Sequence, residues 1–423
     1  MVRSMSGLPG PFGCCHMKLF AALGPGDIVA AHRAQMRGEA FLSETSIIFS
    51  GQLFEYCRER GIETLALSRH PRTDCLCDGP LRLENRARWF AYAGGVSYHI
   101  GNIAYAFYLA TRARLFGADL AIVDFGSTHA FALTLFRLLG IQVAVNLHNT
   151  LWPAGYPPEA SVARLLLRLD AYFFRRIPVA VIGVSPECGR QVKQLAGQAL
   201  PYFEYRAQFR QEGFDLQRCE HGLDPFRVAF IGRVEVSKGA LDIPLIAEQT
   251  LKRSSRPIVF EVCGDGGALP ALKHVVEEKK LGEVVQIHGR LSRPDLLQVY
   301  GRAHVVIVPT RSDFFEGFAL VCAEAVLAGV PVITNGVVPA LEVLREACVE
   351  AETDNVASYV DAILTLSENP GLYAQLENAC PRLAQQFYDR SRSYPAAVDR
   401  LLASTFPNWK LSAFYEPLFD RIP

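Results

Sequence analysis

The chain has 423 residues, which is too long for one ordinary domain and suits two or three. Half of the residues are hydrophobic, and 43 Lys and Arg balance 43 Asp and Glu, so the formal net charge is zero. This composition excludes a disordered chain and argues against nucleic acid held by bulk charge, although a local basic site for a small anion is still allowed.

The cysteine pattern and the N-terminal residues indicate in which cellular compartment the protein is expected. The 11 cysteines are odd in number and form no Cys-x-x-Cys pair, which favours a reduced, cytoplasmic setting over a disulfide framework or a zinc site. Residues 1–16 are broken by glycine and proline, so we expect a disordered extension rather than a signal peptide, with Met1 or Met17 as the start.

Two kinds of pattern alternate in the first half: short β-branched runs and longer helical stretches, as in βαβ units around a parallel sheet. Strands are expected at residues 27–32, 62–67, 119–123, 141–147 and 179–184. Helices are expected at about 44–60, 98–116, 128–139 and 159–176.

Two of these segments raise the question of a membrane. Residues 89–111 lack Asp, Glu, Lys and Arg and are long enough to span a bilayer, but their glycines, His99 and Asn102 favour a buried helix near 97–116. The helix at 159–176 mixes arginines with leucines and aromatics. An ordinary amphipathic helix is favoured over a helix that touches anionic lipid. The arginines concerned are Arg164, Arg168, Arg175 and Arg176.

The second half repeats the alternation after a polar, aromatic segment at 201–225, which we interpret as a connection. Strands are expected at 227–231, 258–263, 284–288, 304–308 and 330–333. Helices are expected at about 238–253, 268–280, 292–302, 319–328, 354–368, 370–386 and 389–405.

The pattern therefore predicts an α/β fold of two facing Rossmann-like, doubly wound parallel-sheet domains, with a ligand cleft between them at the carboxyl ends of the strands. The predicted units are an extension at 1–16, a first domain at 17–205, a connection at 206–225, a second domain at 226–388, and a helix and tail at 389–423 that pack back on the first domain.

A pair of carboxylates follows the expected strand at 304–308. Glu316 and Glu324 are eight residues apart, and residues 317–320 lead from a glycine turn into a helix N-terminus. Free N–H groups and the helix dipole make such a terminus an anion site. Two carboxylates beside an anion indicate a ligand with hydroxyl groups on both sides of a diphosphate, such as a nucleotide sugar.

Basic residues follow the first strand of the second domain. Gly232 and Arg233 end that strand, and Lys238 begins the next helix five residues later. Arg and Lys in one such loop can clamp a pyrophosphate. Gly264 lies in a further glycine-rich turn, which is a weak signal by itself.

Over residues 226–390 the chain resembles the retaining nucleotide-sugar glycosyltransferases of the GT-B fold, specifically glycosyltransferase family 4. The matching motifs are Gly232-Arg233 with Lys238-Gly239, Gly264-Asp265-Gly266, His288-Gly289, Pro309-Thr310, and Glu316 with Glu324. The first half matches more loosely, at residues 145–148 and 182–185. Family members often carry a Gly-Gly turn after the first strand, whereas here Gly24-Pro25-Gly26 precedes the strand expected at 27–32 and Gly38-Glu39 follows it.

The resemblance implies roles for individual residues. The catalytic set is Glu316 at the donor sugar, His148 near the reacting carbon, and Arg233 and Lys238 at the leaving diphosphate. The other donor-binding residues are Gly232, Gly264, Arg290 and Leu291 near the base, Gly317, Phe318, Ala319 and Leu320 at the phosphates, and Glu324 at the ribose.

The resemblance also implies an activity. The expected reaction moves a sugar from a nucleotide-diphosphate donor to the hydroxyl of a glycan or glycolipid acceptor, with retention, in polysaccharide or glycolipid biosynthesis. No metal is expected to take part, because the chain has no Asp-x-Asp pair and Arg and Lys supply the cations. Three rivals stay open: a GT-B epimerase or hydrolase, a glycan phosphorylase, and a binding protein with a degenerate GT-B fold.

Overall fold

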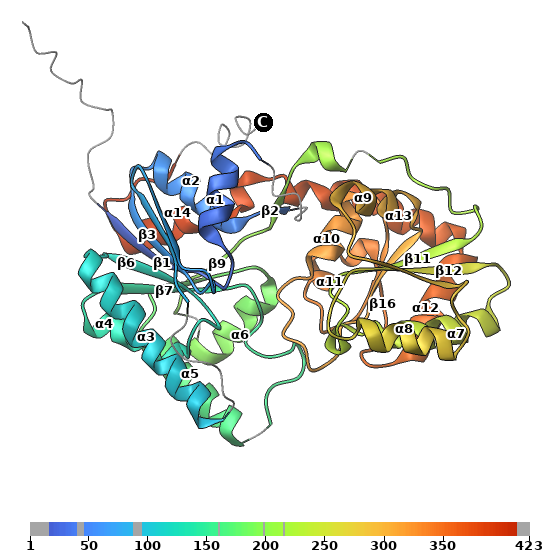
Figure 1. Cartoon of the computed structure of the whole chain (residues 1–423), viewed down its shortest axis with the longest axis horizontal. Coiled ribbons are helices and arrows are strands. Elements are labelled where there is room, and N and C mark those ends of the chain that lie inside the picture. Colours follow the sequence, from blue (N-terminus) through green and yellow to red (C-terminus); the bar gives the residue numbers. More distant parts are fainter. Residues whose placement is uncertain are drawn as a thin grey trace, which may run out of the picture.

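The computed structural model describes residues 17–39, 46–87, 95–159, 161–197, 199–214 and 216–412. These residues form two α/β domains side by side, each with a mostly parallel sheet between layers of helices (Figure 1). The predicted class, two Rossmann-like doubly wound domains, is confirmed. The extension expected at 1–16 and the tail beyond Ser412 lie outside the described residues.

The first domain is built on an eight-stranded sheet in which β4 alone is antiparallel to its neighbour. In sheet order the strands are β4 (Asp74–Asp78), β5 (Leu81–Asn85), β3 (Glu63–Ser68), β1 (Lys18–Ala22), β6 (Leu120–Asp124), β7 (Gln142–Leu147), β8 (Ala180–Gly183) and β9 (Tyr202–Glu204). The central strands are buried along their length, as expected for strands covered on both faces.

Helices cover both faces of this sheet (Figure 1). One face carries α1 (Ile28–Met36), α2 (Phe49–Glu59) and α14 (Tyr394–Thr405). The other carries α3 (Val96–Phe116), the 3₁₀ helix η1 (Ala130–Leu133), α4 (Thr134–Leu138), α5 (Ser161–Arg176) and α6 (Pro186–Ala196).

The prediction of a strand at residues 27–32 is wrong, because these residues form the N-cap and the first turn of helix α1. The Asp27 side chain accepts a hydrogen bond from the Ala30 N–H at 2.8 Å and caps that helix. The first strand is instead β1, whose sequence KLFAA contains no β-branched residue and so gave no strand signal. Strands β4, β5 and β9 were also missed.

The second domain has a six-stranded, all-parallel sheet. In sheet order its strands are β13 (Val285–Gly289), β12 (Ile258–Cys263), β11 (Phe226–Ile231), β14 (Val305–Val308), β15 (Val332–Thr334) and β16 (Cys348–Glu350). Its helices are α7 (Ile243–Arg253), α8 (Leu269–Glu278), α9 (Arg293–Arg302), α10 (Leu320–Leu327), α11 (Ala340–Val343), α12 (Val356–Glu368) and α13 (Pro370–Ala384).

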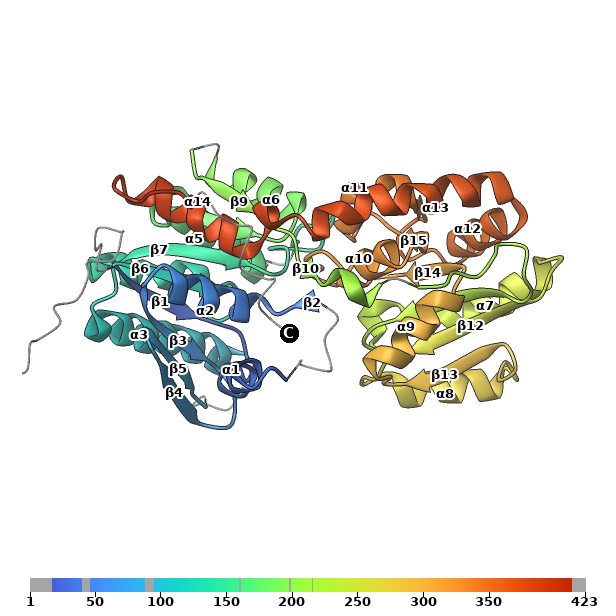
Figure 2. The same cartoon turned by 90° about the horizontal axis from the view of Figure 1, so that it is seen from above.

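The chain crosses between the domains twice (Figure 2). The first crossing follows β9, and its strand β10 (Gln208–Phe209) pairs antiparallel with β2 (Ser46–Ile47). The second follows α13 and leads to α14, which packs against α2, β8 and β9 of the first domain. The two crossings touch, since the Arg206 N–H donates to the Arg392 carbonyl at 2.7 Å.

Among the described residues, no helix is both long and apolar enough to cross a bilayer. Helix α3 occupies most of the uncharged stretch, while residues 88–94 lie outside the described part of the chain. The expectation of a buried helix there is half right. Asn102, Ala106, Leu109, Ala110 and Ala113 are buried against the domain, but the opposite side of α3 is exposed.

Candidate active site

Both sheets reverse their strand order next to the same pocket. In the first sheet β3 and β6 lie on opposite sides of β1, and in the second β12 and β14 lie on opposite sides of β11. Ligands of doubly wound sheets bind in the crevice at such switch points, beyond the carboxyl ends of the strands. The end of β6 and the loops after β1, β7 and β14 line one interdomain pocket of about 510 Å³.

The glycine turn at residues 24–26 follows the first strand and lines this pocket. It precedes only the wrongly predicted strand at 27–32, whose residues begin α1. The Gly24 N–H donates to the Asp124 carboxylate at 2.9 Å, which ties the turn after β1 to the end of β6. A glycine turn therefore does follow the first strand, as Gly-Pro-Gly rather than the Gly-Gly of the family.

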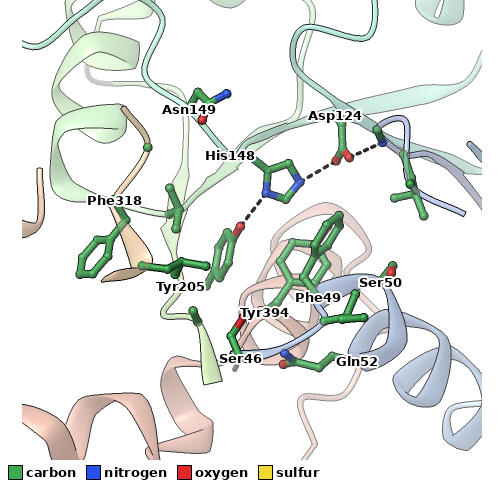
Figure 3. Close-up of a pocket in the computed structure, with 18 of the residues that line it drawn as sticks. Ser46, Phe49, Ser50, Gln52, Asp124, His148, Asn149, Tyr205, Phe318 and Tyr394 are labelled. Carbon is green, nitrogen blue, oxygen red and sulfur yellow. Dashed lines mark hydrogen bonds and ion pairs between the residues drawn. The ribbon is translucent and has the colours of Figure 1, made fainter. Parts of the chain in front are cut away.

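His148 lies just beyond the end of β7, and the first domain holds its ring by both nitrogens (Figure 3). The Nδ1 atom is 3.0 Å from the Tyr205 hydroxyl, while Nε2 is 3.2 Å from Asp124 Oδ1 and 2.8 Å from Asn146 Nδ2. The Phe49 ring lies against the imidazole, with 4.2 Å between the centroids. Burial raises the pKa of Tyr205 well above its usual value, so this phenol keeps its proton.

The bonding of His148 limits what its ring can do. Because both nitrogens have partners, proton exchange with a ligand would require one of those hydrogen bonds to break. Asp124 is equally committed, since it is 3% exposed and receives hydrogen bonds from Gly24 and Asn146. The arrangement fixes the position of the imidazole and places a buried negative charge behind it.

In the second domain, Lys238 contacts Glu316 through its Nζ atom. The Lys238 ammonium also lies 4.0 Å from the centre of the Phe314 ring, and the Arg233 guanidinium lies 5.7 Å from the same centre. Two cations thus lie near one aromatic ring, and Lys238 is also in contact with a carboxylate that is 7% exposed. The loop that holds Lys238 needs Gly239, which has a φ of 73° and whose Cβ would lie 2.1 Å from the Pro309 carbonyl oxygen.

The loop that carries Glu316 touches the first domain. A Cβ on Gly317 would lie only 1.8 Å from the His148 carbonyl oxygen and 3.2 Å from Val184 Cγ1. Only glycine fits this contact without a movement of backbone. The contact brings Glu316 and His148, expected from opposite domains, to the wall of one pocket.

Helix α10 starts immediately after this loop. Its N-terminus lies at the pocket, where Gly317, Phe318, Ala319 and Leu320 all form part of the lining, and the first N–H groups of a helix have no partner within the helix. Ala319 has a φ of 69°, a left-handed conformation that is costly for a residue other than glycine. Strain of this kind is typical of binding sites.

The remaining predicted residues lie outside the pocket lining. Glu324, on α10, is 8% exposed and accepts a hydrogen bond from the Tyr300 hydroxyl at 2.7 Å. Burial and the neighbouring Glu324 raise the pKa of Tyr300 well above its usual value, so this phenol stays a donor. Gly232, Arg233, Lys238, Gly264, Arg290 and Leu291 follow the carboxyl ends of β11, β12 and β13 along the same sheet edge.

Sequence reasoning missed four residues of this site, Asp124, Tyr205, Phe314 and Tyr300. Asp124 could have been found, because it directly follows the expected strand at 119–123 and so shares a sheet edge with His148. The three aromatic residues gave no signal, since their partners lie far along the chain. Within the described part of the chain, no cluster of three or more His, Cys, Asp or Glu side chains could hold a metal ion.

Comparison with known sequences gives a family for the second domain. Residues 214–382 match the profile described as glycosyl transferases group 1. A D-inositol 3-phosphate glycosyltransferase 1 from Catenulispora acidiphila is 31% identical over 207 residues, 46% of this chain and 48% of the relative. An alpha-D-kanosaminyltransferase from Streptomyces kanamyceticus is 22% identical over 291 residues, 65% of this chain and 73% of the relative. The chain thus spans about half of the first relative's length.

Solved structures extend the likeness to the whole fold. A sucrose-phosphate synthase from Thermosynechococcus elongatus has a TM-score of 0.70 at 16% identity and covers 92% of this chain and 99% of that one. The Anabaena protein HepE in complex with UDP has a TM-score of 0.62 at 15% identity, with the same coverage. At these identities the likeness establishes the GT-B fold. Residues 214–382 of this GT-B chain therefore match the group 1 glycosyl transferases.

Proposed function

We propose that this chain is a retaining, metal-independent glycosyltransferase that moves a sugar from a nucleotide-diphosphate donor to an acceptor hydroxyl. The observation that carries the proposal is the wall formed where Gly317 meets His148. There, a buried carboxylate and a helix N-terminus from the second domain share the pocket with an imidazole held by the first, and Lys238, outside the lining, contacts that carboxylate.

The leaving group sets the electrostatic requirement. Cleavage of a glycosyl phosphate develops negative charge on the diphosphate, which preplaced cations and N–H groups stabilise without reorganisation. Arg233, Lys238 and the first turn of α10 offer these groups. We propose that they replace the divalent cation that other transferases place on the diphosphate.

The fate of the acceptor proton favours retention. An inverting transfer needs a free base on the acceptor side. Of the described residues that line the pocket, Asp124 and Glu316 carry carboxylates, and both are engaged, by Gly24, Asn146 and His148 in one case and by Lys238 in the other. We propose that the leaving phosphate oxygen takes the proton from an acceptor held on the same face of the sugar.

The donor is a nucleotide sugar, and relatives narrow the first candidates. Anabaena HepE has been crystallised with UDP and with UDP-glucose, so UDP-hexoses are the first donors to test. Relatives named for D-inositol 3-phosphate and for O-antigen biosynthesis suggest polyol and glycan acceptors. We propose an acceptor of the glycan or glycolipid class, which agrees with the second of these names, and keep a polyol phosphate as the alternative.

Thermal shift with UDP, GDP, ADP and CMP, each in EDTA and in Mg²⁺, tests the donor site. A ligand at 100 times its dissociation constant adds about 2.7 kcal/mol, so one nucleoside diphosphate should raise the melting temperature by several degrees in EDTA. A shift that requires Mg²⁺ would contradict metal independence. No shift in a folded protein would favour the degenerate binding protein.

Turnover with the matching nucleotide sugar then tests the chemistry. We expect Glu316→Gln and His148→Ala to lose activity and keep their fold, whereas Glu346→Gln, at an exposed carboxylate, should keep both. The anomeric configuration of the first product, read by NMR, decides retention. Sugar released to water in the presence of every acceptor tried would favour the hydrolase alternative.

A further inference from the structure

Helix α3 carries a stripe of exposed apolar side chains on the flank of the first domain. Val96 is 74% exposed, Ile100 62%, Ile103 43% and Phe107 63%. Their spacing of four, three and four residues places them on one side of the helix. Isolated exposed apolar residues are ordinary, but a continuous row along a helix marks a contact surface.

Helix α5 repeats this pattern with basic residues between the apolar ones. Its large exposed apolar side chains are Val162, Leu165, Leu169 and Tyr172, with exposed fractions from 41% to 64%. The basic residues are Arg164, Arg168, Arg175 and Arg176, all exposed. Exposed apolar and cationic side chains on one helix face are typical of helices that lie in a membrane interface.

The two helices belong to one flank of the molecule. Both pack against η1, and Figure 1 shows α3, α4 and α5 on the side of the sheet opposite α1, α2 and α14. Helix α4 adds exposed Arg137 and Leu138 to this flank. We call the exposed sides of α3, α4 and α5 the α3–α5 face.

The α3–α5 face is strongly positive, although the formal net charge of the whole chain is zero. Its helices contain seven arginines and one acidic residue, Asp170. Asp170 accepts a hydrogen bond from the Phe131 N–H of η1 at 3.2 Å. Within the part of the chain that the structure describes, no carboxylate pairs with six of the seven: Arg114, Arg137, Arg164, Arg168, Arg175 and Arg176.

We propose that the α3–α5 face docks the protein on a membrane surface rich in anionic phospholipid. The apolar side chains would enter the boundary between headgroups and acyl chains, and the arginines would bind lipid phosphates. A second copy of the chain is a poorer occupant, because a two-fold contact through this face would bring the same unpaired arginines of both copies together. This inference concerns where the protein acts and does not depend on the reaction.

Sedimentation of the full-length chain with vesicles tests the proposal. We expect partition onto phosphatidylcholine vesicles that contain phosphatidylglycerol, weaker partition at high salt, and little partition onto phosphatidylcholine alone. Arg164→Gln with Arg168→Gln should lower the partition coefficient about thirtyfold. Ile100→Ser with Phe107→Ser should lower it about tenfold or more, because apolar area is lost.

The control variant replaces two exposed arginines of the second domain, which lie outside the α3–α5 face. The side chains of Arg345 and Arg382 are 60% and 64% exposed, and changing both to Gln should leave partition within about twofold of the original. Circular dichroism establishes that each variant is folded. The proposal is overturned if the unaltered chain ignores anionic vesicles, if the control loses partition as strongly as the face variants, or if light scattering shows a dimer that the face variants break.

Discussion

The contact of Gly317 with the His148 carbonyl allows a test of whether activity depends on the close approach of the two domains. Adding one methyl group in Gly317→Ala would place a Cβ 1.8 Å from that oxygen. Real Cβ contacts are rarely shorter than 3.0 Å, so the backbones must separate by about 1.2 Å. Misplacement of reacting groups by about 1 Å can cost about a hundredfold in rate.

We therefore expect kcat/KM of Gly317→Ala to fall about a hundredfold in an assay of nucleoside diphosphate release. Nucleotide affinity, measured by calorimetry, should fall by much less than kcat/KM, because Arg233, Lys238 and Glu324 all lie within the second domain and keep their places when the domains separate. Overpacking costs about 1–3 kcal/mol, so the melting temperature should drop by only a few degrees.

A matched glycine separates this contact from a general glycine effect. Gly282 lies in the same domain, its φ is not positive, and a Cβ there would meet nothing within 4 Å. Gly282→Ala should therefore behave as the unaltered chain. Full activity of Gly317→Ala would refute the inferred contact. An equal loss of nucleotide affinity and turnover would place the damage in the donor site instead.

Three further predictions follow from the charged groups. Lys238→Met should lower kcat by about 10²–10³-fold and destabilise the fold by leaving Glu316 buried without its cation; adding Glu316→Gln should restore the melting temperature but not the rate. Asp124→Asn keeps the shape but removes the charge behind His148, so kcat should fall about tenfold at unchanged nucleotide affinity, as calorimetry with steady-state kinetics would show. Burial raises the pKa of Asp170 to about 6, so the folded state holds this proton more tightly than the unfolded state does. Stability should be greatest below about pH 4 for this group, fall by about 3 kcal/mol as the pH rises through 6 and then level off. Asp170→Asn should flatten that dependence in urea titrations, and an unchanged slope would contradict the assignment.

The sequence predicted the second domain better than the first, for physical reasons. Strands such as β11 and β12 are rich in Val, Ile and Phe, and the Arg233, Lys238 and Glu316 motif combines charges that a core does not hold without cause. Strand β1, with alanines and no β-branched residue, looks like a helix until its neighbours are known.

The site residues that were missed contact partners that are distant in the sequence. Tyr205 is 57 residues from His148, and Tyr300 is 24 residues from Glu324, so neither contact follows a local pattern. Arg290 and Leu291 lie on the predicted sheet edge but away from the pocket. Local sequence patterns predict which residues lie at the carboxyl edge of each sheet. Which side chains meet across the pocket depended on how two domains face each other.

The two crossings between the domains also have a mechanical consequence. A single connection would leave the domains free to twist and slide, but two connections joined by the hydrogen bond from Arg206 to Arg392 define a line. Two adjacent crossings held together in this way favour rotation of the domains about them, as in a hinge. The domains can then open to admit a donor and still close in one register. Each closure would return Gly317 to the same carbonyl of His148, so the precision of the site would survive repeated opening.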